Sequence, residues 1–230
     1  MRQIEFSLSG HGGRRQGAGR KPGASRGNVP HRARPIHSAR NPVILTLRST
    51  LRALRSSFVF PTIRRVVADV NRRRRDGFRI VHFSVQRDHL HLLIEAADRR
   101  ALSAGARSLA ITLALRLNRL VQRRGRVIAD RWHARALTSP RAVRHAMVYV
   151  IGNFRKHDRD ASAVIDVFSS APFFTGFREL EGVSPVDHPR AGRLRALGPP
   201  HRSVVEPART WLLGVGWQKL GLIGLREGPA

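Results

Sequence analysis

The 230-residue sequence contains no cysteine, a single tyrosine and only 15 acidic residues. Without cysteine, disulfide frameworks, thiolate zinc sites and cysteine nucleophiles are excluded, and a cytosolic, nucleoid-associated location is expected. Aromatic residues make up 6% of the chain, so a core must rely on aliphatic side chains. No apolar run reaches the ~20 residues that cross a bilayer or the length of a signal peptide's core. We therefore expect no membrane span and no secretion signal.

Positive charge is what the sequence has in excess. Lysine and arginine number 43, which gives a formal net charge of +28. Such a chain repels itself unless a polyanion is near, and the two candidates are nucleic acid and an anionic membrane surface. Most of the cations are arginine, whose planar fork matches phosphate geometry. We expect a nucleic-acid partner and no membrane.

The composition divides the chain into three parts. Residues 1–40 are predicted to be a disordered basic arm, because they are rich in Gly, Arg, Pro and Ser and lack apolar periodicity. Within the arm, Arg20 and Lys21 lie in a Gly-Arg-Lys-Pro run that resembles an AT-hook core. The alternative is a solvated basic tail without base preference. Residues 41–165 are the predicted catalytic-type domain, and residues 166–230 are an extension of unknown role.

Hydrophobic periodicity predicts the order strand, helix, strand, strand, helix, strand, helix within the middle part. The expected elements lie at residues 42–47, 61–75, 78–86, 89–96, 101–123, 127–138 and 140–157. This is the βαββαβ pattern of an α+β, ferredoxin-like or RRM-like fold, with an antiparallel sheet, helices on one face and a further helix that carries the tyrosine. The other face of the sheet is expected to be open for function.

The first candidate site is His89-Leu90-His91 on a predicted strand. Residues two apart on a strand point to the same side, so the two imidazoles could share a divalent ion. Two imidazoles hold a metal weakly, and a third, oxygen-donating ligand with waters would complete the shell. The alternative is a pair of packed or exposed histidines without a ligand.

The second candidate site is Tyr149, on the last predicted helix. Asn153 lies one turn further on the same face, so a phenol and an amide are presented together. The alternative is an amphipathic tyrosine that packs at the edge of the domain.

Taken together, these motifs resemble a known family. Asp88-His89-Leu90-His91-Leu92 resembles the HUH motif, and Tyr149-x-x-x-Asn153 is similar to the tyrosine-helix motif of single-tyrosine HUH transposases. Residues 124–127 and 130–135 look most like the REP-associated tyrosine transposase branch of the IS200-like group. The resemblance covers about residues 41–160.

The resemblance implies a metal-assisted transesterification on single-stranded or hairpin DNA. In that family Mg²⁺ or Mn²⁺ is held by the histidines, here His89 and His91, and the tyrosine, here Tyr149, attacks the scissile phosphate. The products are a 5′-phosphotyrosine and a free 3′-hydroxyl. Asn153 stands where some relatives have a glutamine as the third metal ligand. The family usually forms homodimers, in which the tyrosine helix of one subunit can complete the site of the other.

Further basic residues are candidates for contact with DNA phosphates. They are the cluster at the end of the first predicted helix and two arginines of the fourth predicted strand, with a neighbouring histidine as a less favoured ligand: Arg72, Arg73, Arg74, Arg75, Arg131, Arg135 and His133. The alternative for the helix cluster is a solvated helix end.

Three other functions remain open from the sequence. One is a catalytically inactive or domesticated binder of hairpin DNA, and another is a metal-dependent nuclease in which water attacks. The third is an RRM-like module that stacks bases on an open sheet. The positions expected to be exposed on the central strands are polar and offer no Phe or Tyr platform, which favours catalysis: His82, Ser84, Gln86, His89 and His91.

Overall fold

The computed structural model describes residues 37–74, 76–154, 165–180, 182–185, 187 and 204–229. All of them belong to one compact unit that spans Pro35–Ala230. Arg20, Lys21 and Arg75 lie outside the described residues, as does the predicted basic arm apart from residues 37–40. Among the described residues, no helix combines the length and the apolar character needed to cross a bilayer.

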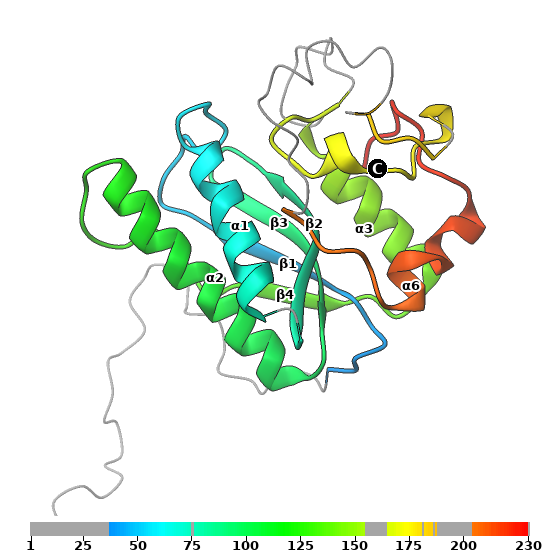
Figure 1. Ribbon diagram of the computed structural model, residues 1–230, viewed down its shortest axis with the longest axis horizontal. Helices are drawn as coiled ribbons and strands as arrows, with labels where there is room; N and C mark the ends of the chain where they lie inside the picture. The colour runs from blue at the N-terminus through cyan, green and yellow to red at the C-terminus, as the bar shows by residue number, and fades with distance from the viewer. Residues whose placement is uncertain are drawn as a thin grey trace, which may run out of the picture. The chain divides into compact units, whose positions relative to one another are not determined.

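A four-stranded antiparallel sheet forms the centre of the unit (Figure 1). Its strands are β1 (Val43–Arg48), β2 (Phe78–Val85), β3 (His89–Ala96) and β4 (His133–Ala136), in the spatial order β2-β3-β1-β4. With the helices α1 and α2 between them, the strands follow the βαββαβ order. The predicted α+β, ferredoxin-like fold is therefore confirmed.

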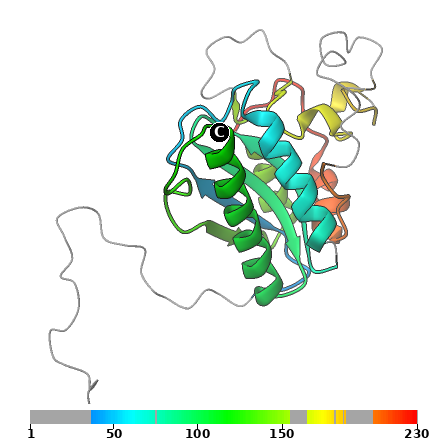
Figure 2. The same ribbon diagram turned by 60° about the vertical axis from the view of Figure 1, so that its left-hand side comes forward.

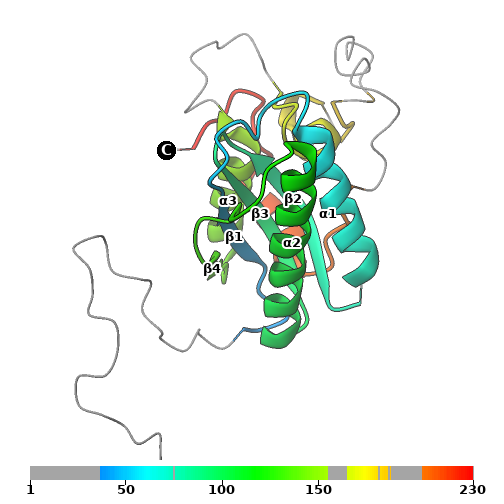
Figure 3. The same cartoon turned by 90° about the vertical axis from the view of Figure 1, so that its left-hand side faces the viewer.

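Helices α1 (Phe60–Arg74) and α2 (Arg99–Leu120) lie side by side over one face of the sheet (Figures 2 and 3). Their apolar side chains recur at helical spacing and are buried against the strands. The close approach of α2 to β2 depends on Gly105, where a Cβ would lie 2.2 Å from ring carbons of Phe78. The principal core lies in this layer and includes Ile63, Val66, Val70, Leu109, Leu113, Leu117, Leu45, Ile80 and Leu92.

Helix α3 (Pro140–Gly152) covers the other face of the sheet (Figure 1). It begins where predicted, because the Ser139 side chain accepts a hydrogen bond from the Ala142 amide and proline occupies the first turn. A second core joins α3 to Val81 and Leu93 of the sheet. The expectation of an open functional face was wrong, since Ser84, Gln86 and His91 beneath this layer are all buried.

The fourth strand is shorter than predicted. Only His133–Ala136 pairs regularly with β1, although an isolated bridge joins Ile128 to Ser49. Between the Thr46–His133 pair and the Ser49–Ile128 bridge, β1 advances three positions while the opposite chain advances five. Two extra residues therefore bulge out and interrupt the ladder, which an alternating sequence pattern does not reveal.

The C-terminal residues extend the layer that contains α3. Helix α6 (Trp211–Gly214) and the 3-10 helix η3 (Gly216–Leu220) pack against it, together with η1 (Ala171–Phe173), and η2 (Arg178–Leu180) lies in the same part of the chain. Their apolar side chains complete the second core with Phe174, Phe177, Leu213 and Trp217. Whether residues 166–230 act as a separate extension stays a prediction.

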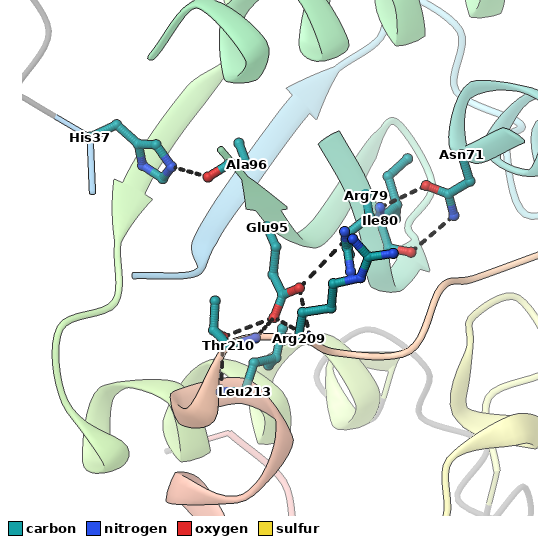
Figure 4. Close-up of polar contacts among 9 residues, drawn as sticks. All are labelled: His37, Asn71, Arg79, Ile80, Glu95, Ala96, Arg209, Thr210 and Leu213. Carbon is teal, nitrogen blue, oxygen red and sulfur yellow. Dashed lines mark hydrogen bonds and ion pairs between the residues drawn. The ribbon is translucent and has the colours of Figure 1, made fainter. Parts of the chain in front are cut away.

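Glu95 of β3 anchors this C-terminal segment to the sheet (Figure 4). Its carboxylate accepts hydrogen bonds from the backbone amides of Arg209 and Thr210 and from the Thr210 hydroxyl, at 2.7–3.0 Å. The buried guanidinium of Arg79 lies 3.7 Å away on the neighbouring strand. A single carboxylate thus satisfies a buried cation and the start of α6.

Replacing Glu95 with alanine should lower the free energy of unfolding by about 3 kcal/mol, because a buried cation and two amides lose their partner. Urea denaturation would measure the loss. The control is Asp130→Ala, which removes an exposed carboxylate and should stay within about 0.5 kcal/mol of the native chain. Equal stability of the two variants would contradict the anchoring role.

Candidate functional site

The two histidines of β3 lie on the sheet face that α3 covers. Their ring centroids are 4.6 Å apart with an interplanar angle of 76°. In the antiparallel register with β1, Thr46 is opposite His91 and Arg48 is opposite His89. The strand geometry that the sequence predicted for the pair is therefore what the structure has.

Both imidazoles have their Nδ1 atom engaged by a neighbouring oxygen. His89 Nδ1 lies 2.7 Å from Asp88 Oδ1, and His91 Nδ1 lies 3.0 Å from Thr46 Oγ1. The hydrogen bond from His89 lowers the pKa of Asp88, which keeps the carboxylate ionised. Protein metal sites commonly hold Nδ1 in this way, so that Nε2 is oriented toward a metal. The outer contacts of the pair thus fit a divalent ion on the two Nε2 atoms.

Tyr149 of α3 meets His91 of its own chain. Its Oη lies 3.1 Å from Nε2 of His91, and the two ring centroids are 4.7 Å apart. Partial burial raises the pKa of Tyr149 through desolvation, so the phenol stays protonated at neutral pH. The three rings follow one another in the order Tyr149, His91, His89.

Two buried side-chain amides, Gln86 beside His89 and Asn153 four residues after Tyr149, have a polar atom without a partner in the described part of the chain. Asn153 caps the C-terminus of α3 and is 1% exposed, and its Nδ2 has no hydrogen bond. Gln86 closes the β2–β3 hairpin, where its backbone N–H donates to the His89 carbonyl, and its side-chain Oε1 is unpartnered. The described residues contain no group of three His, Cys, Asp or Glu that could hold a metal. An ion here would need an amide oxygen, and Asn153 can supply one if its amide is turned over.

Two cavities flank the ring series. Tyr149 lines a cavity of about 530 Å³ together with His133 and Arg135, which places these two predicted contacts beside the tyrosine. His89 lines a second cavity of about 550 Å³ with Gln86 and three arginines, Arg52, Arg55 and Arg87. Sequence reasoning missed these arginines, because they lie in a loop and a turn, where charge gives no periodic signal.

The other predicted phosphate contacts lie away from the rings. Arg72, Arg73 and Arg74 end α1, on the opposite face of the sheet, and Arg72 pairs with Asp69 of the same helix. Arg131 is exposed in the segment before β4. The structure does not bring these residues to the His–Tyr cluster, so a role in DNA binding stays a prediction for them.

His82 of β2 lies half-buried beneath the C-terminal layer. Its Nδ1 is 3.3 Å from Ser170 Oγ, and its ring meets the Phe174 ring edge to face at 5.5 Å. Desolvation lowers the pKa of His82 to about 4. The residue was predicted to be exposed, and its partial burial by the segment around η1 is a correction.

This burial makes a prediction about acid stability. The unfolded chain protonates His82 near pH 6.5 but the folded chain only near pH 4, so stability is lost as the pH falls through that interval. Between pH 7 and pH 5 the loss from this group should be about 2 kcal/mol. His82→Gln should reduce the pH dependence of unfolding by that amount in urea titrations at the two pH values. If the native protein and the His82→Gln variant show the same change in unfolding free energy between the two pH values, His82 is not the source of the pH dependence.

Comparison with known proteins finds a solved structure with a similar fold. No protein-family model matches the sequence, and no curated protein matches it significantly. Among solved structures, a REP-associated tyrosine transposase bound to a REP hairpin aligns with a TM-score of 0.51 over 79% of this chain and 93% of that chain, at 14% identity. This chain has the fold of that transposase. A Deinococcus radiodurans protein described as a transposase aligns over 48% of this chain and 86% of its own, with 13% identity and a TM-score of 0.37.

Proposed function

We propose that the protein is a transposase-type enzyme that cuts and rejoins single-stranded DNA through a 5′-phosphotyrosine intermediate. The observation that carries the proposal is the 3.1 Å approach of Tyr149 Oη to His91 Nε2 within one chain, with the His89 ring edge-on to the His91 ring. The shared fold with a tyrosine transposase supports the class of enzyme. The chemistry rests on the residues of this chain.

In the proposed reaction, Tyr149 Oη forms a bond to the scissile phosphorus while the bond from phosphorus to the 3′-oxygen breaks. The phenol proton passes to water in the cavity that Tyr149 lines, and the departing 3′-oxygen takes a proton from water. Rejoining is the reverse reaction, and the phosphotyrosine conserves the energy that it needs. The raised pKa of Tyr149 means that the phenol does not ionise without help from its surroundings.

The nitrogen and oxygen donors near Tyr149 fit a divalent cation, Mg²⁺ or Mn²⁺, which would assist this ionisation. His89 and His91 would hold it through Nε2, and Asn153 is the proposed oxygen ligand. When bound, such a cation polarises the scissile phosphate as a Lewis acid. Asp88 and Thr46 keep the imidazoles oriented for this task.

Hairpin-bearing single-stranded DNA is the proposed partner. The net charge of +28 supports a polyanionic ligand, and the structurally similar transposase is bound to a REP hairpin. An RRM-like stacking module is less well supported, because α3 and the C-terminal segment lie over the sheet face that would receive bases. Since Tyr149 reaches His91 of its own chain, the proposed homodimer is not needed to bring the tyrosine to the histidine pair.

The test is to mix the full-length protein with hairpin-bearing single-stranded oligonucleotides and Mn²⁺, then denature the mixture. We expect a covalent protein–DNA adduct that survives denaturation, together with a fragment that ends in a 3′-hydroxyl. DNA binding without cleavage would instead identify an inactive binder. Cleavage without an adduct would identify a nuclease that uses water.

A further inference from the structure

The ring series separates two cavities that have no lining residue in common. Tyr149 lines one cavity and His89 lines the other. His91 lies between them, with its ring centroid 4.7 Å from that of Tyr149 and 4.6 Å from that of His89. If the scissile phosphate of a DNA strand lies at the rings, the nucleotides on one side of it would therefore face one cavity and those on the other side would face the second cavity.

The cavity beside His89 is lined by three arginines and by one carboxylate, Asp88, which is engaged with His89 Nδ1. Arg52 and Arg87 are exposed, and in the described part of the chain their side chains have no hydrogen bond or ion pair. Arg55, in contrast, is fixed: its guanidinium donates to Asp166 Oδ2 at 3.0 Å and to the Val85 carbonyl at 2.9 Å. Arg52 and Arg87 are thus available for phosphates.

Gln86 adds a buried acceptor to the same cavity. The side-chain Nε2 of Gln86 donates to Ser84 Oγ, 2.6 Å away. This contact fixes the orientation of the amide and leaves Oε1 as its unpartnered end. A buried acceptor without a donor costs free energy until a ligand supplies one.

The chemistry of the cut assigns a strand to each cavity. In a displacement at phosphorus, the attacking and leaving oxygens lie on opposite sides of the phosphorus atom. Attack by Tyr149 therefore drives the 3′-oxygen away from the tyrosine, toward the side of His89. This step rests on the proposed function.

We propose that the cavity beside His89 holds the 3′-hydroxyl segment of the cut strand. Arg52 and Arg87 bind its phosphates, and Gln86 Oε1 accepts a hydrogen bond from the new 3′-hydroxyl. The segment that carries the 5′-phosphotyrosine lies on the side of the other cavity. Holding the 3′-end in place keeps it ready to attack the phosphotyrosine, which re-forms the phosphorus–3′-oxygen bond and returns the proton to the phenol.

The first test measures binding and needs no cleavage. In a Tyr149→Phe background, a ten-residue oligothymidylate with a 3′-hydroxyl should bind about fivefold more tightly than the same oligomer with a 3′-deoxy end, the value of one net hydrogen bond. Gln86→Met, which keeps the volume and removes the acceptor, should abolish this difference. Equal affinity for the two oligomers before that substitution would overturn the proposal.

The arginines are tested by the salt dependence of the same binding. Arg52→Gln with Arg87→Gln should reduce the slope of log affinity against log salt by about 1.4, because two phosphate contacts to a single strand are lost. The matched control is Arg107→Gln with Arg119→Gln, which removes the same charge from exposed positions of α2. A control pair that lowers the slope equally would overturn the role of the cavity.

Strand polarity is tested by photocrosslinking. An oligothymidylate with a 3′-terminal 4-thiothymidine should crosslink to residues 86–89, whereas crosslinks from that end to β4 or α3 would reverse the proposed polarity. The wild-type adduct assay reports on the proposed function separately. A normal adduct with the reversed polarity would contradict only this inference. Absence of an adduct would contradict the proposed function on which the inference rests.

Discussion

Replacing both His89 and His91 with alanine should abolish Mn²⁺-dependent cleavage. The two Nε2 atoms are the proposed nitrogen ligands, and their outer oxygens, Asp88 and Thr46, cannot reach the same position once the rings are gone. A Lewis acid at a scissile phosphate contributes several kcal/mol, so we expect cleavage to fall at least about 10³-fold. Calorimetry with Mn²⁺ alone should show the loss of binding independently of activity.

Asp88→Asn provides the graded comparison for this pair. It retains both rings and removes only the carboxylate that orients His89, and such changes weaken metal affinity by about 10- to 100-fold. Asn153→Ala tests the third ligand by the same Mn²⁺ titration. Cleavage that persists undiminished in the double histidine variant would reject the ligand assignment.

Tyr149→Phe should eliminate the covalent adduct while leaving DNA binding within about twofold of the native protein. The substitution deletes one oxygen and keeps the aromatic ring, so the packing of α3 against His91 is retained. The lost contact to Nε2 is worth about 1 kcal/mol of stability, which thermal unfolding would check. Because the chain contains a single tyrosine, no other residue can form a phosphotyrosine.

The outcome of this substitution separates the candidate functions. An adduct that persists in the phenylalanine variant would show that another nucleophile acts. If the variant cleaves DNA normally and neither the variant nor the native protein forms an adduct, attack by water would be favoured. Loss of both adduct and DNA binding would point to a role for the tyrosine in holding DNA.

The sequence predicted the His pair and the sheet because local rules determine them. Period-two alternation defined the strand His89–Ala96 and placed His89 and His91 on one side. Ser139 and Pro140 marked the start of α3 for equally local reasons. The placement of Tyr149 next to His91 depends on long-range packing, and only the family resemblance suggested it.

Most of the features that sequence reasoning missed depend on contacts between distant segments. Glu95 binds residues more than a hundred positions away, so its anchoring role has no local signal. The covering of the sheet face by Phe174 and Trp217 has the same origin, and it partly buries His82 against expectation. Arg52 joins Arg87 and His89 only when the loop after β1 meets the hairpin turn, whereas Arg87 is close to His89 in sequence.

The most direct measurement of the central claim is peptide mass spectrometry of the denatured adduct. After nuclease digestion of the DNA, the account predicts a nucleotide 5′-phosphate attached to the peptide that contains Tyr149, formed only when the divalent cation is present. A nucleotide on any other residue, or cleaved DNA with an unmodified Tyr149 peptide, would contradict it.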